Sequence, residues 1–172
     1  MHIRLGTDND VAAIRAVEHA AFRNHPQHAP GAEPTEHLIV DALRSASRLS
    51  LSLVAEDRGE VTGHVALSPA VVGEDGQGWY MLGPVGVSPG RQGRGIGSAL
   101  VREALRIIRD QGARGVVLVG DPAYYGRFGF RAWPGLIMDG VPQENVLAVS
   151  LDGREPEGGV RADPAFLVTA DE

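Results

Sequence analysis

The sequence predicts an α/β fold with a mixed, mostly antiparallel sheet, and three observations lead to this prediction. Strand-like and helix-like segments follow one another in the order β-α-α-β-β-β-α-β-α-β-β. Short turns containing glycine and aspartate join three consecutive strands, which indicates antiparallel hairpins. A helix then separates the fourth strand from the fifth, which indicates one parallel crossover.

The N-terminal part predicts a strand and two helices. Residues 2–5 read as a short strand, and Thr7 with Asp10 three positions later forms a variant of the capping box. Apolar residues at helical spacing follow this cap: Val11, Ile14, Val17 and Ala21. A polar loop rich in proline and histidine spans residues 23–34, and Thr35 is placed to cap the second helix. The apolar face of that helix comprises Leu38, Ile39, Ala42 and Leu43.

The centre of the chain predicts three strands and a long helix. The three strands are expected at residues 49–55, 60–72 and 79–87, with turns at 57–59 and 73–76. The third helix spans about residues 95–111, and Gly112 ends it. Its apolar stripe comprises Leu100, Val101, Ala104, Leu105 and Ile108.

The C-terminal part predicts a buried strand at residues 115–119, a short helix around Tyr125, and strands near 135–138 and 145–151. Residues 152–159 are polar, and residues 160–172 either add an edge strand or remain loose. We therefore expect a single domain over residues 1–172, with a core over about 2–151 and a C-terminal extension at 152–172.

The composition narrows the class of protein. The 172 residues carry a formal net charge of −6, which argues against a general nucleic-acid binder and favours a cationic partner such as an amine. No apolar run reaches membrane-spanning length, and the N-terminus lacks the apolar stretch of a signal peptide. We expect no membrane association and, by default, a cytoplasmic protein. The absence of cysteine excludes disulfides and an acyl-cysteine intermediate.

The run from Val85 to Gly97 is the most informative segment, because an apolar strand passes through a glycine- and arginine-rich turn into a helix. Glycines let backbone N–H groups converge, and the helix start adds free N–H groups and a positive dipole end. This combination predicts a cradle for phosphate or pyrophosphate. A Walker A loop is excluded because Ile96-Gly97 replace its Lys-Ser/Thr, and Ser98 replaces the third glycine of a dinucleotide fingerprint.

Two segments in order resemble the signatures of the GNAT superfamily of N-acetyltransferases. Residues 92–97 fit the acetyl-CoA signature Gln/Arg-x-x-Gly-x-Gly/Ala and follow Val87-Ser88-Pro89. About 30 residues later, residues 125–130 fit Tyr-x-x-x-Gly-Phe. Leu82-Gly83-Pro84 and Gly-Asp-Pro-x-Tyr-Tyr at residues 120–125 are similar to a subgroup of small bacterial predicted acetyltransferases. The resemblance covers roughly residues 2–151.

This resemblance implies a GNAT-like sheet of six to seven strands flanked by about four helices, with a splayed parallel pair at the CoA site. Glycine and proline at 83–84 are typical of a bulge in the strand before the loop. Acetyl-CoA would be the co-substrate, and Tyr125 the general acid that protonates the departing thiolate. The residues expected to bind acetyl-CoA are Val85, Gly86, Val87, Gln92, Gly93, Arg94, Gly95, Ile96, Gly97 and Ser98. Arg91 is a weaker candidate for phosphate contact.

The general base is left open. Five residues lie in segments that border the acceptor cleft in the family: Glu18, His19, Glu36, His37 and His64. A satisfied structural histidine is the preferred reading of His64, and a base acting through water is a further alternative. His25 and His28 lack a third ligand, so we predict no metal.

The function expected is transfer of an acetyl group from acetyl-CoA to a primary amine by direct attack in a ternary complex. The acceptor would be a small-molecule or peptide amine, and a homodimer is consistent with the family. Two alternatives come from other classes: a catalytically silent CoA-binding sensor, and a nucleotide-binding regulator of another fold. Neither the acceptor nor the length of the acyl chain can be read from the sequence.

Overall fold

A computed structural model describes residues 1–23, 25–26, 28–29, 31–74 and 76–168. Residues 24, 27 and 30 of the predicted loop, residue 75 of the predicted turn and residues 169–172 of the tail lie outside this description. The helices are α1 Val11–Phe22, α2 Glu36–Ser45, α3 Ile96–Asp110 and α4 Pro122–Tyr125. The strands are β1 His2–Leu5, β2 Leu51–Asp57, β3 Glu60–Val72, β4 Trp79–Val87, β5 Gly115–Val119, β6 Arg131–Ala132, β7 Leu136–Ile137, β8 Val146–Ser150 and β9 Gly158–Arg161.

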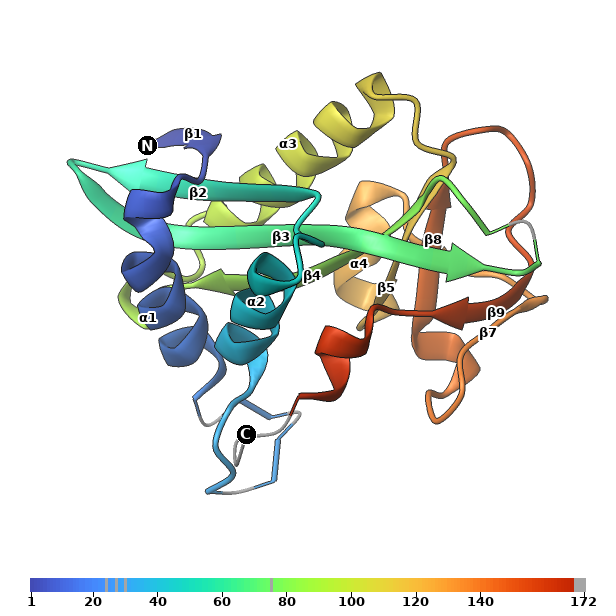
Figure 1. Cartoon of the computed structure of the whole chain (residues 1–172), viewed down its shortest axis with the longest axis horizontal. Coiled ribbons are helices and arrows are strands. Elements are labelled where there is room, and N and C mark those ends of the chain that lie inside the picture. The colour runs from blue at the N-terminus through green and yellow to red at the C-terminus, as the bar shows by residue number, and fades with distance from the viewer. Residues whose placement is uncertain (24, 27, 30, 75, 169–172) are drawn as a thin grey trace.

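These strands form one mixed sheet in the order β1-β2-β3-β4-β5-β8-β6. β9 pairs with the far end of β3 and with the short strand β7 (Figure 1). All neighbours along the main path are antiparallel except β4 and β5, which are joined by the crossover helix α3. The prediction of a mostly antiparallel sheet with one parallel crossover is confirmed.

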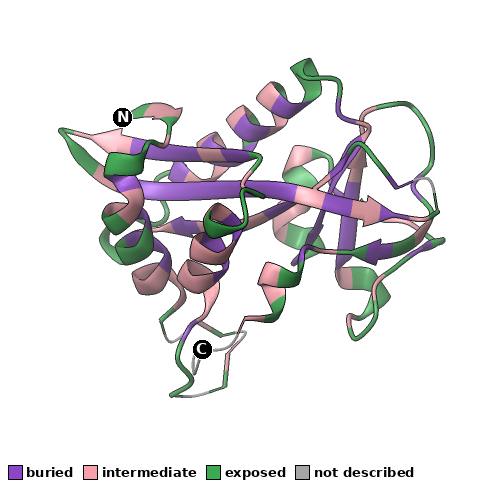
Figure 2. Cartoon of the chain, viewed as in Figure 1, coloured by how far each residue is buried: buried purple, intermediate pink, exposed green. Residues whose placement is uncertain are grey.

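The helices cover the sheet on both faces, with α1 and α2 on one side and α3 on the other (Figure 1). Alternation along β3 directs Val65 and Leu67 into the core beside α3, while Ala66 packs with Ile14 and Val40 beneath α1 and α2. As a result most of β3 is buried on both faces, and the exposed residues lie on the outer sides of the helices and in the connecting loops (Figure 2).

The start of α1 shows how the predicted cap is built. The Asp10 carboxylate accepts hydrogen bonds from the Thr7 backbone N–H at 2.7 Å and from its hydroxyl at 3.2 Å. Arg4 on β1 adds two bonds from its guanidinium, at 2.8 and 2.9 Å. The capping motif was predicted from the sequence, whereas the partnership with Arg4 was not.

The central feature of the sheet is the separation of β4 from β5. Their ladder includes only Trp79–Met81 against Gly115–Val117. On the opposite side of β4, one residue of β3, Ala66, faces two of β4, Gly83 and Pro84, between the Val65–Val85 and Leu67–Leu82 pairs, which is a β-bulge. The β4–β5 ladder ends at Met81, so residues 82–87 diverge from β5, as the family resemblance implied for the splayed pair.

The observed sheet has nine strands within the described residues, compared with the six to seven that were expected. The additional strands are β6, which has two residues, and β9, which begins just before the predicted tail. None of the helices in the described part combines the length and apolar character that a membrane crossing requires.

Candidate functional site

A cleft of about 990 Å³ opens where β4 and β5 diverge. Its walls come from the second half of β4, the glycine loop, the first turn of α3, the end of β5, and α4. The C-terminal end of α1 and residues 23, 25 and 26 close one side. Val119 at the end of β5 lines the cleft and is 48% exposed, and the ladder between β4 and β5 ends before it. The cleft thus presents unpaired strand edges beside a helix N-terminus.

The loop between β4 and α3 depends on its glycines and on one glutamine. Gly93 and Gly95 have φ of +77° and +83°, a conformation that side chains with a Cβ rarely adopt. Gly95 is the N-cap of α3, so the first backbone N–H groups of that helix lack intrahelical acceptors. Gln92 donates from Nε2 to the carbonyl of Val87 at 3.0 Å and ties the loop to β4. This geometry suits an anion at the helix start.

The arginines near this loop differ in their partners. Arg91 donates to Asp57 at 2.8 Å and to Glu60 at 3.3 Å, so it is already held by two carboxylates. Arg94 is exposed and does not line the cleft. Arg127, which sequence reasoning missed, does line it: its Nε donates to the Tyr124 carbonyl at 2.8 Å and its guanidinium lies 4.3 Å from the Tyr124 ring centre.

Tyr125 lies in the cleft wall formed by α4. Its ring packs against Gly120, where a Cβ would come within 2.6 Å of Tyr125 Cε2. Burial, with smaller effects of Tyr124 and Glu18, raises the pKa of Tyr125 to about 12. The phenol is therefore protonated at neutral pH and can donate a proton. Tyr124 also lines the cleft, and its hydroxyl lies 3.4 Å from the ideal Cβ position of Gly97.

The five candidate bases occupy different environments. Glu18 and His64 are fully buried and hydrogen bonded to each other at 2.8 Å. His19 and His37 pack edge to face with ring centres 4.9 Å apart, and burial lowers the pKa of His37. Glu36 is bonded to His28 at 2.6 Å. Glu18 and His64 thus form a polar pair in the core beneath α1.

Most of the predicted acetyl-CoA residues meet at the cleft. Those lining it are Val85, Val87, Gln92, Gly93, Gly95, Ile96, Gly97 and Ser98, together with Tyr125. Gly86 and Arg94 do not line it. The Cα of Gly86 faces α1 instead, where an added Cβ would meet Glu18 Oε2 at 2.7 Å. The resemblance implied that the segment carrying Glu18 and His19 borders the acceptor cleft, and the end of that helix, at residues 20–22, does line this cleft.

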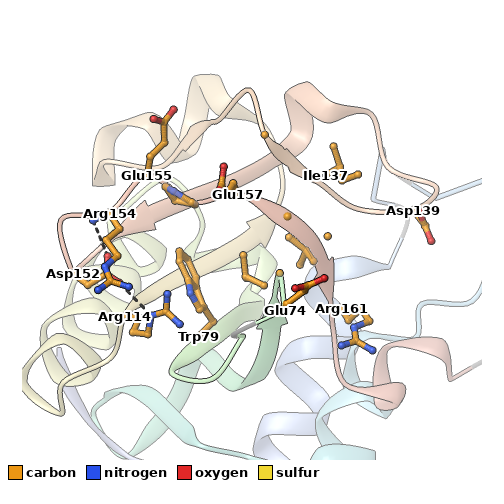
Figure 3. Close-up of a pocket in the computed structure, with 17 residues that line it drawn as sticks. Glu74, Trp79, Arg114, Ile137, Asp139, Asp152, Arg154, Glu155, Glu157 and Arg161 are labelled. Carbon is orange, nitrogen blue, oxygen red and sulfur yellow. Dashed lines mark hydrogen bonds and ion pairs between the residues drawn. The ribbon is translucent and has the colours of Figure 1, made fainter.

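A second pocket of about 900 Å³ lies at the opposite end of β4, over Trp79 (Figure 3). Its rim mixes arginines with carboxylates, and Arg114 Nε contacts Asp152 at 3.2 Å. Among the described residues, His, Asp and Glu form no group of three or more that could hold a metal ion. Our expectation of no metal stays a prediction.

Comparison with known proteins identifies the family. The model of the acetyltransferase (GNAT) domain matches residues 2–133. The Escherichia coli K12 N-acetyltransferase YhbS is 41% identical over 146 residues, which cover 78% of this chain and 81% of that protein.

Two solved structures extend the likeness to the whole fold. A GNAT acetyltransferase from Brucella melitensis, in complex with acetyl-CoA, superimposes with a TM-score of 0.82 at 45% identity, covering 96% of this chain and 97% of that one. Escherichia coli YhbS in complex with CoA gives a TM-score of 0.84 at 29% identity, covering 97% and 92%. The GNAT-like fold predicted from two short motifs is confirmed, and the chain belongs to the GNAT family of acetyltransferases.

Proposed function

We propose that this protein transfers an acetyl group from acetyl-CoA to a primary amine at the cleft between β4 and β5. The observation that carries the proposal is that the splayed strands, the glycine loop and Tyr125 share one cleft. The acetyl-CoA in the Brucella relative and the CoA in YhbS support the same ligand here.

In this proposal the pyrophosphate lies against the backbone of residues 92–98, where the positive-φ glycines and the start of α3 supply N–H groups. The pantetheine arm follows the unpaired edge of β4 along Val85, Gly86 and Val87. Gly86 contributes only through its backbone, because its Cα faces α1. Arg94 provides charge from the exposed side of the loop rather than from the cleft wall.

The reaction proceeds by direct attack. The amine lone pair forms a C–N bond with the thioester carbonyl, and a backbone N–H of β4 stabilises the oxyanion. The C–S bond then breaks with its electron pair going to sulfur, which receives the proton of Tyr125. The amine nitrogen loses one proton to solvent water, and the phenolate left on Tyr125 regains a proton from solvent. With no cysteine in the chain, an acyl-thioester on the protein is excluded, and a ternary complex is the simplest route.

Amine-dependent turnover tests this function. The protein is incubated with acetyl-CoA and a panel of primary amines, free CoA thiol is followed by a colorimetric thiol reagent, and the acetylated amine is identified by mass spectrometry. We expect CoA release that depends on the amine and matches acetylated product. Binding of acetyl-CoA without turnover of any amine would instead support the sensor alternative.

A further inference from the structure

Glu18 places a carboxylate in the core beside the cleft. Its side chain projects from α1 and has 0% exposure. One oxygen, Oε1, is bonded to His64 Nδ1 at 2.8 Å. The other, Oε2, is buried and has no hydrogen-bond partner among the described residues. An unsatisfied buried carboxylate oxygen is costly, and such atoms are rare in folded proteins.

Glu18 Oε2 lies close to the part of β4 that lines the cleft. An added Cβ on Gly86 would lie 2.7 Å from Glu18 Oε2 and 3.1 Å from the Ala21 methyl group. Val85 and Val87 on either side of Gly86 line the cleft, and so does Ala21. Glycine at 86 is therefore what lets the carboxylate reach β4 at the point where the thioester would lie.

His64 is held from its other side. Its Nε2 is 2.8 Å from Ser52 Oγ on β2, and Ser52 is partly exposed. With Glu18 ionised, Nδ1 carries the proton that Oε1 accepts, and Nε2 accepts the proton of the serine hydroxyl. Ser52, His64 and Glu18 thus form one hydrogen-bonded chain that fixes the carboxylate and directs Oε2 toward β4.

We propose that Glu18 is the proton acceptor for the amine, and that His64 and Ser52 are positioning residues that hold its carboxylate. The inference rests on the proposed function. One N–H bond of the ammonium breaks and its electron pair stays on nitrogen. The proton passes through one water molecule beside Ala21 and forms an O–H bond at Oε2. It returns to solvent after the acetylated product leaves.

The surroundings of Glu18 suit this role. The titratable groups that act on it are His64 on β3, Glu36 on α2 and Tyr125 on α4. Burial raises the pKa of Glu18, the hydrogen bond from His64 opposes this, and the charge of Glu36 adds to it. A carboxyl group with a raised pKa is a stronger base than an exposed one, and so better matched to proton transfer near neutral pH.

The test compares Glu18→Gln with the wild-type protein across pH. The substitution keeps the shape of the side chain and removes the base. We expect unchanged acetyl-CoA affinity and a loss of roughly 10²–10⁴-fold in kcat/KM for alkyl amines at pH 7. The deficit should shrink as pH approaches the amine pKa of about 10.4, and it should be small for weakly basic amines that are neutral at pH 7.

Two further variants separate catalysis from support of the fold. His64→Asn retains a donor near Nδ1 but breaks the link to Ser52, and it should shift the acidic limb of the kcat/KM profile. Ser68→Ala is the matched control, because Ser68 on β3 also has a buried hydroxyl oxygen without a partner. It should leave the pH profile unchanged.

The outcomes distinguish the two proposals. No amine turnover by the wild-type protein defeats the proposed function. If the wild-type protein turns over amines but Glu18→Gln keeps the wild-type pH profile, the role of Glu18 is overturned and the proposed function stands. The same holds if Glu18→Gln loses kcat/KM equally for strongly and weakly basic amines. If Glu18→Gln does not fold, the kcat/KM profile of His64→Asn decides. An acidic limb that stays at the wild-type position overturns the role of Glu18, whereas a shifted limb supports it.

Discussion

The phenol of Tyr125 is the group on which the proposed chemistry depends most directly. We predict that Tyr125→Phe lowers kcat by roughly 10²–10⁴-fold, because the departing thiolate loses its proton donor, while acetyl-CoA affinity stays the same. Tyr124→Phe is the matched control: its hydroxyl lies beside Gly97, so we expect a change in KM rather than in kcat. Steady-state kinetics of both variants measure this. Equal kcat losses would contradict the assignment.

The raised pKa of Tyr125 leads to a prediction about how kcat depends on pH. An acid catalyst is active while protonated, so its contribution is lost only as pH rises through its own pKa, here about 12. We predict that any decline of kcat between pH 8 and 10 belongs to another group and is retained in Tyr125→Phe. A basic limb in this range that disappears in the variant would show that Tyr125 titrates much lower in the complex.

The contacts of Asp10 lead to a prediction about how the free energy of unfolding depends on pH. Arg4 and Thr7 hold its pKa below the usual range, so its contribution is present above pH 3.8 and declines as pH falls from there. We predict that Asp10→Asn lowers the free energy of unfolding at pH 7 by about 1–3 kcal/mol and by less at pH 3. Urea unfolding at both pH values checks this. Exposed Asp8→Asn in the same turn is the control, and an equal loss there would contradict the account.

At the scale of elements, the contact between α1 and β4 depends on residue 86. We predict that Gly86→Ala lowers stability by roughly 1–3 kcal/mol, because its Cβ would overlap Glu18 Oε2 and crowd Ala21. Gly90→Ala is the control, since Gly90 has nothing within 4 Å of an added Cβ. Thermal unfolding of the two variants measures the difference. A Gly86→Ala protein as stable as Gly90→Ala would mean that α1 is not closely packed on β4.

Helices and strands could be predicted where the segment itself shows the spacing of apolar residues that is typical of that element. The strands at 60–72, 79–87 and 115–119 were predicted with the bounds that the structure has, and α3 differs by one residue at each end. β6 was missed because two residues show no periodicity. The edge strand that was left open for residues 160–172 forms as β9 at Gly158–Arg161, and its pairing depends on β3, far earlier in the chain. Pairing of that kind is fixed by tertiary packing, which local propensity does not encode.

At the scale of the whole molecule, the candidate site has one part that is contiguous in the sequence and one part that only the fold brings together. The glycine loop is contiguous, so its shape and its position before α3 could be predicted from spacing. Glu18, His64 and Ser52 come from three elements, with separations of 46 and 12 residues. Ser52 lies between Leu51 and Leu53 and reads as an ordinary outward-facing strand residue, so only the folded structure indicates its partnership with His64.

Calorimetric titration of acetyl-CoA into the wild-type protein, Gly95→Leu and Gly112→Leu tests whether the loop before α3 binds the pyrophosphate. The two glycines flank α3, have φ of +83° and +86°, and leave open space around an added Cβ, so the strain introduced is matched. We expect binding by the wild type and by Gly112→Leu, and binding at least roughly tenfold weaker, about 1.4 kcal/mol, by Gly95→Leu. A folded wild-type protein that does not bind acetyl-CoA, or equal binding by the two variants, would contradict binding of the pyrophosphate at the start of α3.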